Sequence, residues 1–296
     1  MSRHGISRPG REVARFPAVP HDRWLPDRLT GAIELRLETL QDRFVSPGTG
    51  RLALSGSEES EVALKAARSH DRPIVPGSGI KGAVRTLYEL LSFSCNPFDF
   101  KAGCKSPRLC DACSLFGARG HLGRVSFSDA VPYKDGSVRV AVRKLPVGHE
   151  SHGSKTKGDF RFYDLTPDSS PGSGGAPRET HSREVFTGWF RARLAFTNAN
   201  PEELGRLLLC LGLGNEGAPG FPLRLGGVKY DGQGAVRVAA ESLVVRAPRR
   251  EDLKSDACGA RLTAWIAEAL GSPWGATFRP TYDEISATLR SGEGSR

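Results

Sequence analysis

Alternating apolar and polar residues predict the main strands of this chain. Residues 32–40 read AIELRLETL, so Ile33, Leu35 and Leu37 would face a core while the charged residues between them face outward. Residues 186–197 alternate in the same way and carry aromatic side chains. Shorter strands are expected at residues 123–127, 138–142 and 235–238.

Apolar residues with helical spacing predict the helices. Residues 79–91 repeat apolar side chains every three or four positions, and residues 201–213 do the same. Shorter helices are expected at residues 61–67 and 261–270. The expected caps are Ser78 or Gly79 for the helix at 79–91, and Asn198 or Asn200 for the helix at 201–213.

The core elements follow the order β-α-β-β-α-β, so the predicted fold class is α+β with a ferredoxin-like or RRM-like core. We expect this core to span residues 30–245, after an N-terminal arm at 1–29 and before a C-terminal helical extension at 246–296. Three insertions interrupt the expected core: a long loop at residues 42–72, a cysteine module at 95–116, and a polar, Gly/Ser/Pro-rich segment at 143–185.

The formal net charge of +9 favours a polyanionic partner, and nucleic acid before a membrane surface. The basic N-terminus is not followed by an apolar run, so it does not resemble a signal peptide. No stretch of the sequence is long and apolar enough to span a bilayer. These features predict a cytoplasmic protein, and in that compartment clustered cysteines are metal ligands more often than disulfides.

Four of the six cysteines have the spacing of a metal site. Cys95, Cys104, Cys110 and Cys113 follow the pattern C-x8-C-x5-C-x2-C, and the last pair has the spacing that turns two thiolates toward one ion. The pattern predicts a structural Zn²⁺ site without catalytic water, with His121 as a substitute ligand. The alternative is a group of buried free thiols.

Two glycine-rich segments could bring backbone amides close to phosphates. The first, PGSGIKGAVR at 76–85, opens the helix expected at 79–91 and places Lys81 and Arg85 four residues apart on one face. The second, LGGVKYDGQG at 225–234, carries Lys229. The alternatives are a capped surface helix and an ordinary hairpin. Arginines also alternate with aromatic residues around Trp189, a pattern that suits both single-stranded nucleic acid and a plain amphipathic strand.

The long loop at 42–72 holds the acidic residues that could serve a nuclease. Asp42, Glu58, Glu59 and Asp71 are carboxylates that could act on a 2′-hydroxyl or bind a catalytic metal ion if RNA lay beside them. A solvated acidic loop is the alternative for the same residues.

Four motifs in order resemble the RAMP superfamily of CRISPR effectors, and most of all the backbone subunits of type III complexes. They are GSGIKGAVR at 77–85, CDACSLFG at 110–117, GRVSFSDA at 123–130 and LGGVKYDGQG at 225–234. The similarity spans residues 20–240 or so. Each motif is common by itself, whereas the ordered set is specific to the family.

The resemblance implies an RRM-like palm, a zinc-containing insertion and a thumb-like insertion that lies between crRNA and target RNA. Its partners would be crRNA, complementary target RNA, other effector subunits and further copies of the chain. The family's target-RNA cleavage, dependent on Mg²⁺ or Mn²⁺, uses an aspartate in the loop after the first strand, where this chain offers only Asp42, Glu58 and Glu59. The residues matching the RNA-binding motifs are Ser78, Lys81, Gly82, Arg85, Arg124, Gly226, Gly227 and Lys229.

Two other functions fit the sequence less well. A standalone nuclease that processes CRISPR precursor RNA would share the palm and could use His70, His149, His152 or His181 as general acid or base, but such enzymes usually lack a four-cysteine module. A zinc-stabilised RNA-binding protein outside CRISPR systems is the third class.

Overall fold

The structure is a computed structural model, which describes residues 3–6, 12–40, 43–54, 62–95, 103–146, 160–163, 165, 180–214, 220–227, 229 and 232–291. The helices are α1 (Gly77–Leu90), α2 (Asp111–Phe116), α3 (Pro201–Cys210), α4 (Ser255–Gly271) and α5 (Pro273–Arg290). The longer strands are β3 (Leu29–Thr39), β4 (Gly48–Leu54), β5 (Val62–Ala66), β11 (Val138–Pro146), β13 (Thr180–Ala199) and β15 (Ala235–Ala247). The shorter strands are β1 (Arg3–Ile6), β2 (Phe16–Pro17), β6 (Arg68–Ser69), β7 (Arg72–Pro73), β8 (Arg108–Leu109), β9 (Val125–Phe127), β10 (Val131–Pro132), β12 (Phe160–Tyr163), β14 (Leu223–Arg224) and β16 (Glu251–Lys254).

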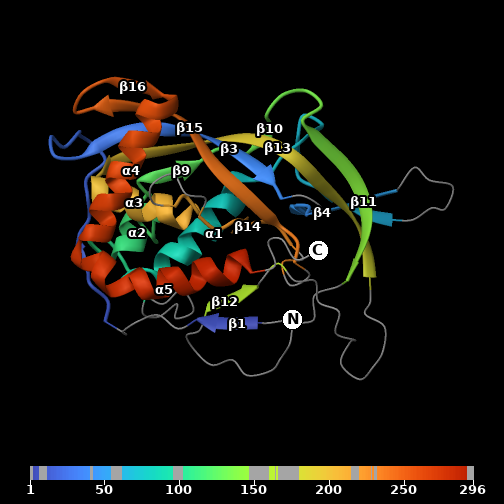
Figure 1. Cartoon of the computed structure of the whole chain (residues 1–296), viewed down its shortest axis with the longest axis horizontal. Helices are drawn as coiled ribbons and strands as arrows, with labels where there is room; N and C mark the ends of the chain where they lie inside the picture. Colours follow the sequence, from blue (N-terminus) through green and yellow to red (C-terminus); the bar gives the residue numbers. More distant parts are fainter. Residues whose placement is uncertain are drawn as a thin grey trace.

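One large mixed sheet organises the molecule (Figure 1). Its strand order is β14-β15-β3-β13-β5-β4, with β9, β10 and β11 also paired to β13 and β16 paired to β15. The central strand β3 is antiparallel to both β13 and β15. The helices gather on one face of the sheet, and β4 and β11 extend beyond them at one end (Figure 1). The fold is therefore of the α+β class, as the sequence predicts.

The alternation in β3 determines which face of the sheet is covered. Ile33, Leu35 and Leu37 are buried, whereas Glu34 and Arg36 are only partly covered on the opposite face. The prediction for residues 32–40 is thus confirmed. The buried face packs against α1 and α3, whose apolar residues belong to the same core as β3. Apolar burial on this single face is the main favourable term for the fold.

Several predicted boundaries need correction. Residues 61–67 are expected as a helix but form β5, and β4 and β5 pair within the segment expected as a loop at 42–72. The segment expected as an insertion at 143–185 contains the end of β11 and the first residues of β13, because these two strands pair over their whole shared length. Helix α1 begins at Gly77, earlier than expected, because the Asp129 carboxylate accepts a hydrogen bond from the Gly77 amide at 2.8 Å.

A buried ion-pair cluster holds the start of α3. Asn200 is the N-cap, and with Glu203 it forms a reciprocal capping box. The Glu203 carboxylate also pairs with Arg124, whose side chain is fully buried, and with Arg28 at 3.0 Å. Burial of Glu203 by itself opposes ionisation, but hydrogen bonding and charge from Arg124 hold the pKa of this carboxyl below its usual value.

We predict that Glu203→Gln lowers the free energy of unfolding by about 3 kcal/mol, because Arg124 then remains buried without its counter-charge. The folded-state pKa of Glu203 is depressed, so its stabilising contribution is present at neutral pH and is lost as the pH falls through that pKa. Urea denaturation at pH 7 and in mild acid measures both effects. In the matched control Glu34→Gln, the lost pair with Arg193 is 46% exposed on each side, and the change should stay below about 1 kcal/mol. Equal losses in the two variants would contradict the prediction.

No described helix is long and apolar enough to cross a membrane.

Candidate functional site

The four clustered cysteines converge on one point in the core. All four are buried, and their sulfur atoms lie within 4.8 Å of one another. The Sγ atoms of Cys95 and Cys113 are 3.5 Å apart, and those of Cys110 and Cys95 are 3.8 Å apart. A tetrahedral zinc with bonds of about 2.3 Å would set its sulfur ligands about 3.8 Å apart. The four cysteines are therefore close enough to hold one metal ion, and His121 does not belong to the cluster.

Local backbone structure presents these thiols. Cys110 is the N-cap of α2, and Cys113 lies in that helix's first turn. Backbone amides support the sulfurs, since Cys95 N donates to Cys110 Sγ at 3.4 Å and Cys110 N donates to Cys104 Sγ at 3.3 Å. Hydrogen bonds from the Cys113 and Cys95 thiols hold the pKa of Cys110 far below its usual value. The same contact with Cys110 raises the pKa of Cys95 to about 11.

Two arginines offset negative charge at the cysteine cluster. Arg85 Nη2 lies 3.9 Å from Cys113 Sγ. The side chain of Arg15, from the N-terminal arm, hydrogen-bonds to Cys104, and this contact raises the pKa of Arg15. A four-thiolate metal site carries a formal charge of −2, so nearby guanidinium groups favour the deprotonated ligands. With four sulfur ligands, such a site is closed to water and suits a structural role.

The start of α1 offers an open backbone surface beside one lysine. Ser78, Gly79 and Gly82 are exposed, and a Cβ atom built on either glycine would meet nothing within 4 Å. Lys81 is half-buried, and burial followed by repulsion from Arg85 lowers its pKa. Within the described part of the chain, no hydrogen bond or ion pair is recorded for Lys81. The helix start can thus accept an anion at Lys81 and the adjacent turn.

Arg85 does not share that position. Its Nε donates to Glu89 at 2.7 Å, and its Nη1 donates to the Gly117 carbonyl at 3.0 Å. The guanidinium therefore ties α1 to the end of the cysteine module. Lys81 and Arg85 were expected to contact successive phosphates, which requires both side chains to be free. The Arg85 guanidinium instead makes hydrogen bonds within the protein.

Arg124 is also an internal residue. It is only 2% exposed, and it donates to the Ser114 hydroxyl, the Asn198 carbonyl and the Glu203 carboxylate. A buried guanidinium with these partners cannot contact a ligand at the surface. The expectation that Arg124 binds RNA is corrected accordingly, because Arg124 holds the cysteine module against α3.

The described residues of the glycine-rich loop at 225–234 contact Ser46, and Lys229 shares a cavity with α1. Gly226 has a φ of 79°, and a Cβ atom there would lie 2.8 Å from the Ser46 carbonyl oxygen, while Gly227 N donates to the same oxygen at 2.9 Å. Lys229 lines a cavity of about 160 Å³ whose opposite wall includes Ala83 and Thr86 of α1. Burial, together with repulsion from Arg224, lowers the pKa of Lys229. The fold thus brings Lys229 to the same helix that carries Lys81.

Comparison with known proteins identifies the family at this point. The RAMP superfamily matches residues 31–209, which is more than half of the chain and runs from β3 into α3. The chain belongs to the RAMP superfamily. No curated protein matches it. RAMP membership points to a CRISPR-associated, RNA-binding function.

The carboxylates considered for cleavage in this RAMP protein, Asp42, Glu58 and Glu59, lie outside the described residues. Asp71 lies in an exposed turn with a φ of 62°, and its backbone carbonyl accepts from Arg68. Of the four histidines considered for precursor processing, His70 is exposed beside Asp71 and His181 is exposed at the start of β13. His149 and His152 lie outside the described residues.

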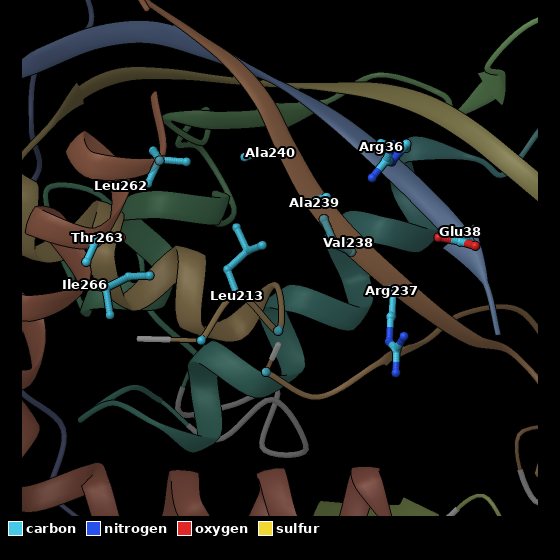
Figure 2. A pocket seen from close by; sticks show the side chains of 14 residues that line it. Arg36, Glu38, Leu213, Arg237, Val238, Ala239, Ala240, Leu262, Thr263 and Ile266 are labelled. Atoms are coloured by element: carbon cyan, nitrogen blue, oxygen red, sulfur yellow. The ribbon is translucent and has the colours of Figure 1, made fainter. Parts of the chain in front are cut away.

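A cavity of about 420 Å³ lies beside β15 in this RAMP protein (Figure 2). Leu213, Leu262 and Ile266 form its apolar side, and Arg36, Glu38 and Arg237 lie at its opposite end. The described residues of the cavity wall include neither a histidine nor a cysteine. Its walls come from β3, β15 and α4, which are far apart in the sequence, so local sequence patterns do not predict this cavity.

Metal analysis of the purified protein should find about one bound ion per chain, and Cys110→Ser should abolish it because a closed site needs all four sulfurs. The matched control is Cys210→Ser, which alters a buried cysteine outside the cluster and should keep the ion. Elemental analysis measures the stoichiometry, and thermal denaturation with a chelator measures its stabilising effect. A stoichiometry near zero, or equal retention in both variants, would contradict the metal site.

Proposed function

We propose that this RAMP protein is an RNA-binding backbone subunit of a CRISPR type III-like complex, which holds crRNA and presents target RNA. One observation carries the proposal: the exposed start of α1 carries Lys81, and Lys229 of the glycine-rich loop lines a cavity together with Ala83 and Thr86 of the same helix. Two lysines without carboxylate partners in the described chain suit a phosphate backbone. Ser78 and Gly82 would allow close backbone approach beside Lys81, whereas Gly226 and Gly227, also expected to bind RNA, make their close contacts with Ser46.

The arrangement of strands supports a ferredoxin-like or RRM-like palm. β15, β3 and β13 lie side by side, β9 pairs with the far side of β13, and α1 and α3 connect β3 to β9 and β13 to β15. We take residues 30–245 as this palm, with the arm at 1–29, the cysteine module at 95–116 and the extension at 246–296. The segment at 143–185 would be the thumb-like element, since it begins within β11 and ends within β13, which pair at the end of the sheet that has no helix below it (Figure 1).

The cysteine cluster would hold structural Zn²⁺ in this function. Four thiolates at tetrahedral spacing are the donor set that zinc prefers. With zinc bound, the cysteine module would be held in place by its four ligands, Cys95, Cys104, Cys110 and Cys113. This module contacts Arg85 through Cys113 and Arg124 through Ser114. The metal's contribution is stability of the α1 start, because the module and the helix share Arg85.

The proposal is tested by purification from a host that expresses the complete CRISPR locus, followed by sequencing of the bound RNA. Guide-length RNA in a particle with other effector subunits, and with further copies of this chain, is the expected result. An RNA-free monomer that cuts repeat RNA would overturn it and favour precursor processing.

We predict that Lys81→Ala weakens binding of single-stranded RNA about fivefold at moderate salt, because one phosphate contact is lost. The slope of log K against log salt should also fall by about 0.7. Fluorescence anisotropy across a salt series measures both quantities. Lys254→Ala, which removes an exposed lysine on β16, is the matched control and should change little. Identical slopes for all three proteins would count against the α1 interface.

Target cleavage is a further part of the proposal, with Asp42, Glu58 or Glu59 binding Mg²⁺ or Mn²⁺. In the assembled complex, Asp42→Ala or the double change Glu58→Ala/Glu59→Ala should reduce cleavage of complementary RNA at least a hundredfold while leaving its binding unchanged. Gel assays with and without Mg²⁺ measure this. If every variant yields normal fragments at the normal rate, these carboxylates are not the catalytic groups.

A further inference from the structure

The sheet face opposite the helices carries two aromatic side chains in contact. Trp189 on β13 is 41% exposed, although its neighbour Phe190 is buried in the core. Tyr133, which directly follows β10, lies edge-on to the indole ring with centroids 6.5 Å apart and an interplanar angle of 76°. An indole left exposed in the middle of a long strand gains nothing from core burial, so its aromatic surface is available to a ligand.

Arginines surround this aromatic pair. The guanidinium carbon of Arg36 lies 4.9 Å from the Trp189 ring centroid. The Glu241 carboxylate holds both Arg36 and Tyr133 in place. Its Oε1 atom lies 3.8 Å from Arg36 Nε and accepts a hydrogen bond from the Tyr133 hydroxyl at 3.0 Å. Arg191 is exposed on the same face of β13 as Trp189, and among the described residues it makes no ion pair. We call Arg36, Tyr133, Trp189 and Arg191 the stacking platform.

The composition of the stacking platform favours single-stranded RNA over a protein partner. A stacking surface bordered by guanidinium groups is the combination that binds unpaired bases and their phosphates. The ring of Trp189 is bordered by a guanidinium group, from Arg36, and by a phenol ring, from Tyr133, so polar groups frame its exposed surface. Of the carboxylates on this face, Glu241 is engaged by Arg36 and Tyr133, and Glu38, the partner of Trp189 on β3, lies in register with Arg237 on β15. The chain's charge of +9 favours the same partner.

Backbone pairing links the stacking platform to the start of α1. Asp129 accepts from the Gly77 amide at the first residue of α1. Val131, two residues later, pairs with Arg191, and Tyr133 N donates to the Trp189 carbonyl at 2.9 Å. Four residues span at most about 14 Å, so the platform and the helix start lie within reach of one short RNA segment.

We propose that the stacking platform binds an unpaired RNA base on Trp189, with Arg191 contacting the adjacent phosphate. This is a second RNA contact, distinct from the phosphate contacts at Lys81 and Lys229, and it rests on the proposed RNA-binding function. Arg36 and Tyr133 are positioning residues, because they hold the indole in its exposed orientation. Recognition by stacking does not depend on base identity, so the platform tolerates any guide or target sequence.

The test compares two exposed tryptophans in the full-length chain. Trp189→Ala removes the platform's indole, and Trp24→Ala removes an indole that is 66% exposed in the N-terminal arm. The probes are a fluorescent 12-nucleotide oligouridylate and the same oligonucleotide made entirely of abasic sites. Trp189→Ala should weaken oligouridylate binding about tenfold, Trp24→Ala should have little effect, and Trp189→Phe should restore most of the affinity. Binding of the abasic probe should be the same in all of these proteins.

Two outcomes would overturn the stacking platform: equal effects of the two alanine variants on oligouridylate, or an equal loss with the abasic probe. Thermal denaturation of Trp189→Phe separates a folding defect from lost stacking, since this variant keeps an aromatic ring. Failure of the proposed α1 interface looks different, because Lys81→Ala should weaken both probes to the same extent. If Lys81→Ala weakens both probes while Trp189→Ala weakens neither, only the platform is wrong. A Trp189→Ala chain that keeps full RNA affinity but loses a protein subunit from the purified complex would make this face a protein interface.

Discussion

The buried pair of Arg124 and Glu203 is the interaction on which the arrangement of this molecule depends. Arg124 reaches the Ser114 hydroxyl in the cysteine module and the Asn198 carbonyl at the end of β13, while Glu203 caps α3 and binds Arg28 from the arm. Three stretches of the chain that are far apart in the sequence, around residues 28, 114–124 and 198–203, therefore meet at two charges. In a low-dielectric interior neither charge is tolerated without the other, so the segments must assemble together.

The two basic residues of the α1 motif, Lys81 and Arg85, have different roles. Lys81 and Arg85 stand one helical turn apart, but Arg85 is held by Glu89, Gly117 and the cluster sulfur of Cys113. Its positive charge offsets the thiolates, and its planar fork joins three groups at once, which a lysine could not do. Lys81 alone is left for an external anion. One short motif thus serves both the cysteine cluster and the surface beside it.

The sequence predicts those features whose cause is local. The alternation in β3, the asparagine cap of α3 and the cysteine spacing each appear within a few residues, and each is present in the structure. The internal role of Arg124 is not local, because its partner Glu203 lies 79 positions away. The Asp129 carboxylate that begins α1 is 52 positions from Gly77. Strands β4 and β5 were not predicted, because glycines and short polar runs interrupt the alternation that marks a strand. Hydrogen bonds between the two strands stabilise them instead.

The open face of the sheet follows from the same asymmetry that builds the core. The large apolar side chains of β3 and of the inner half of β13 are buried in the core that α1 and α3 share, so the residues between them point to the opposite face. Charged residues satisfy that requirement at Arg193 and Glu34, whereas Trp189 places an aromatic ring there that is 41% exposed beside Arg36 and Tyr133. Because β10 fixes Tyr133 beside Trp189 and Asp129 at the start of α1, any RNA that crosses from the helix to the sheet meets charge first and an aromatic surface next. That order suits a protein that binds the phosphates of an RNA strand and positions the bases of that strand by stacking.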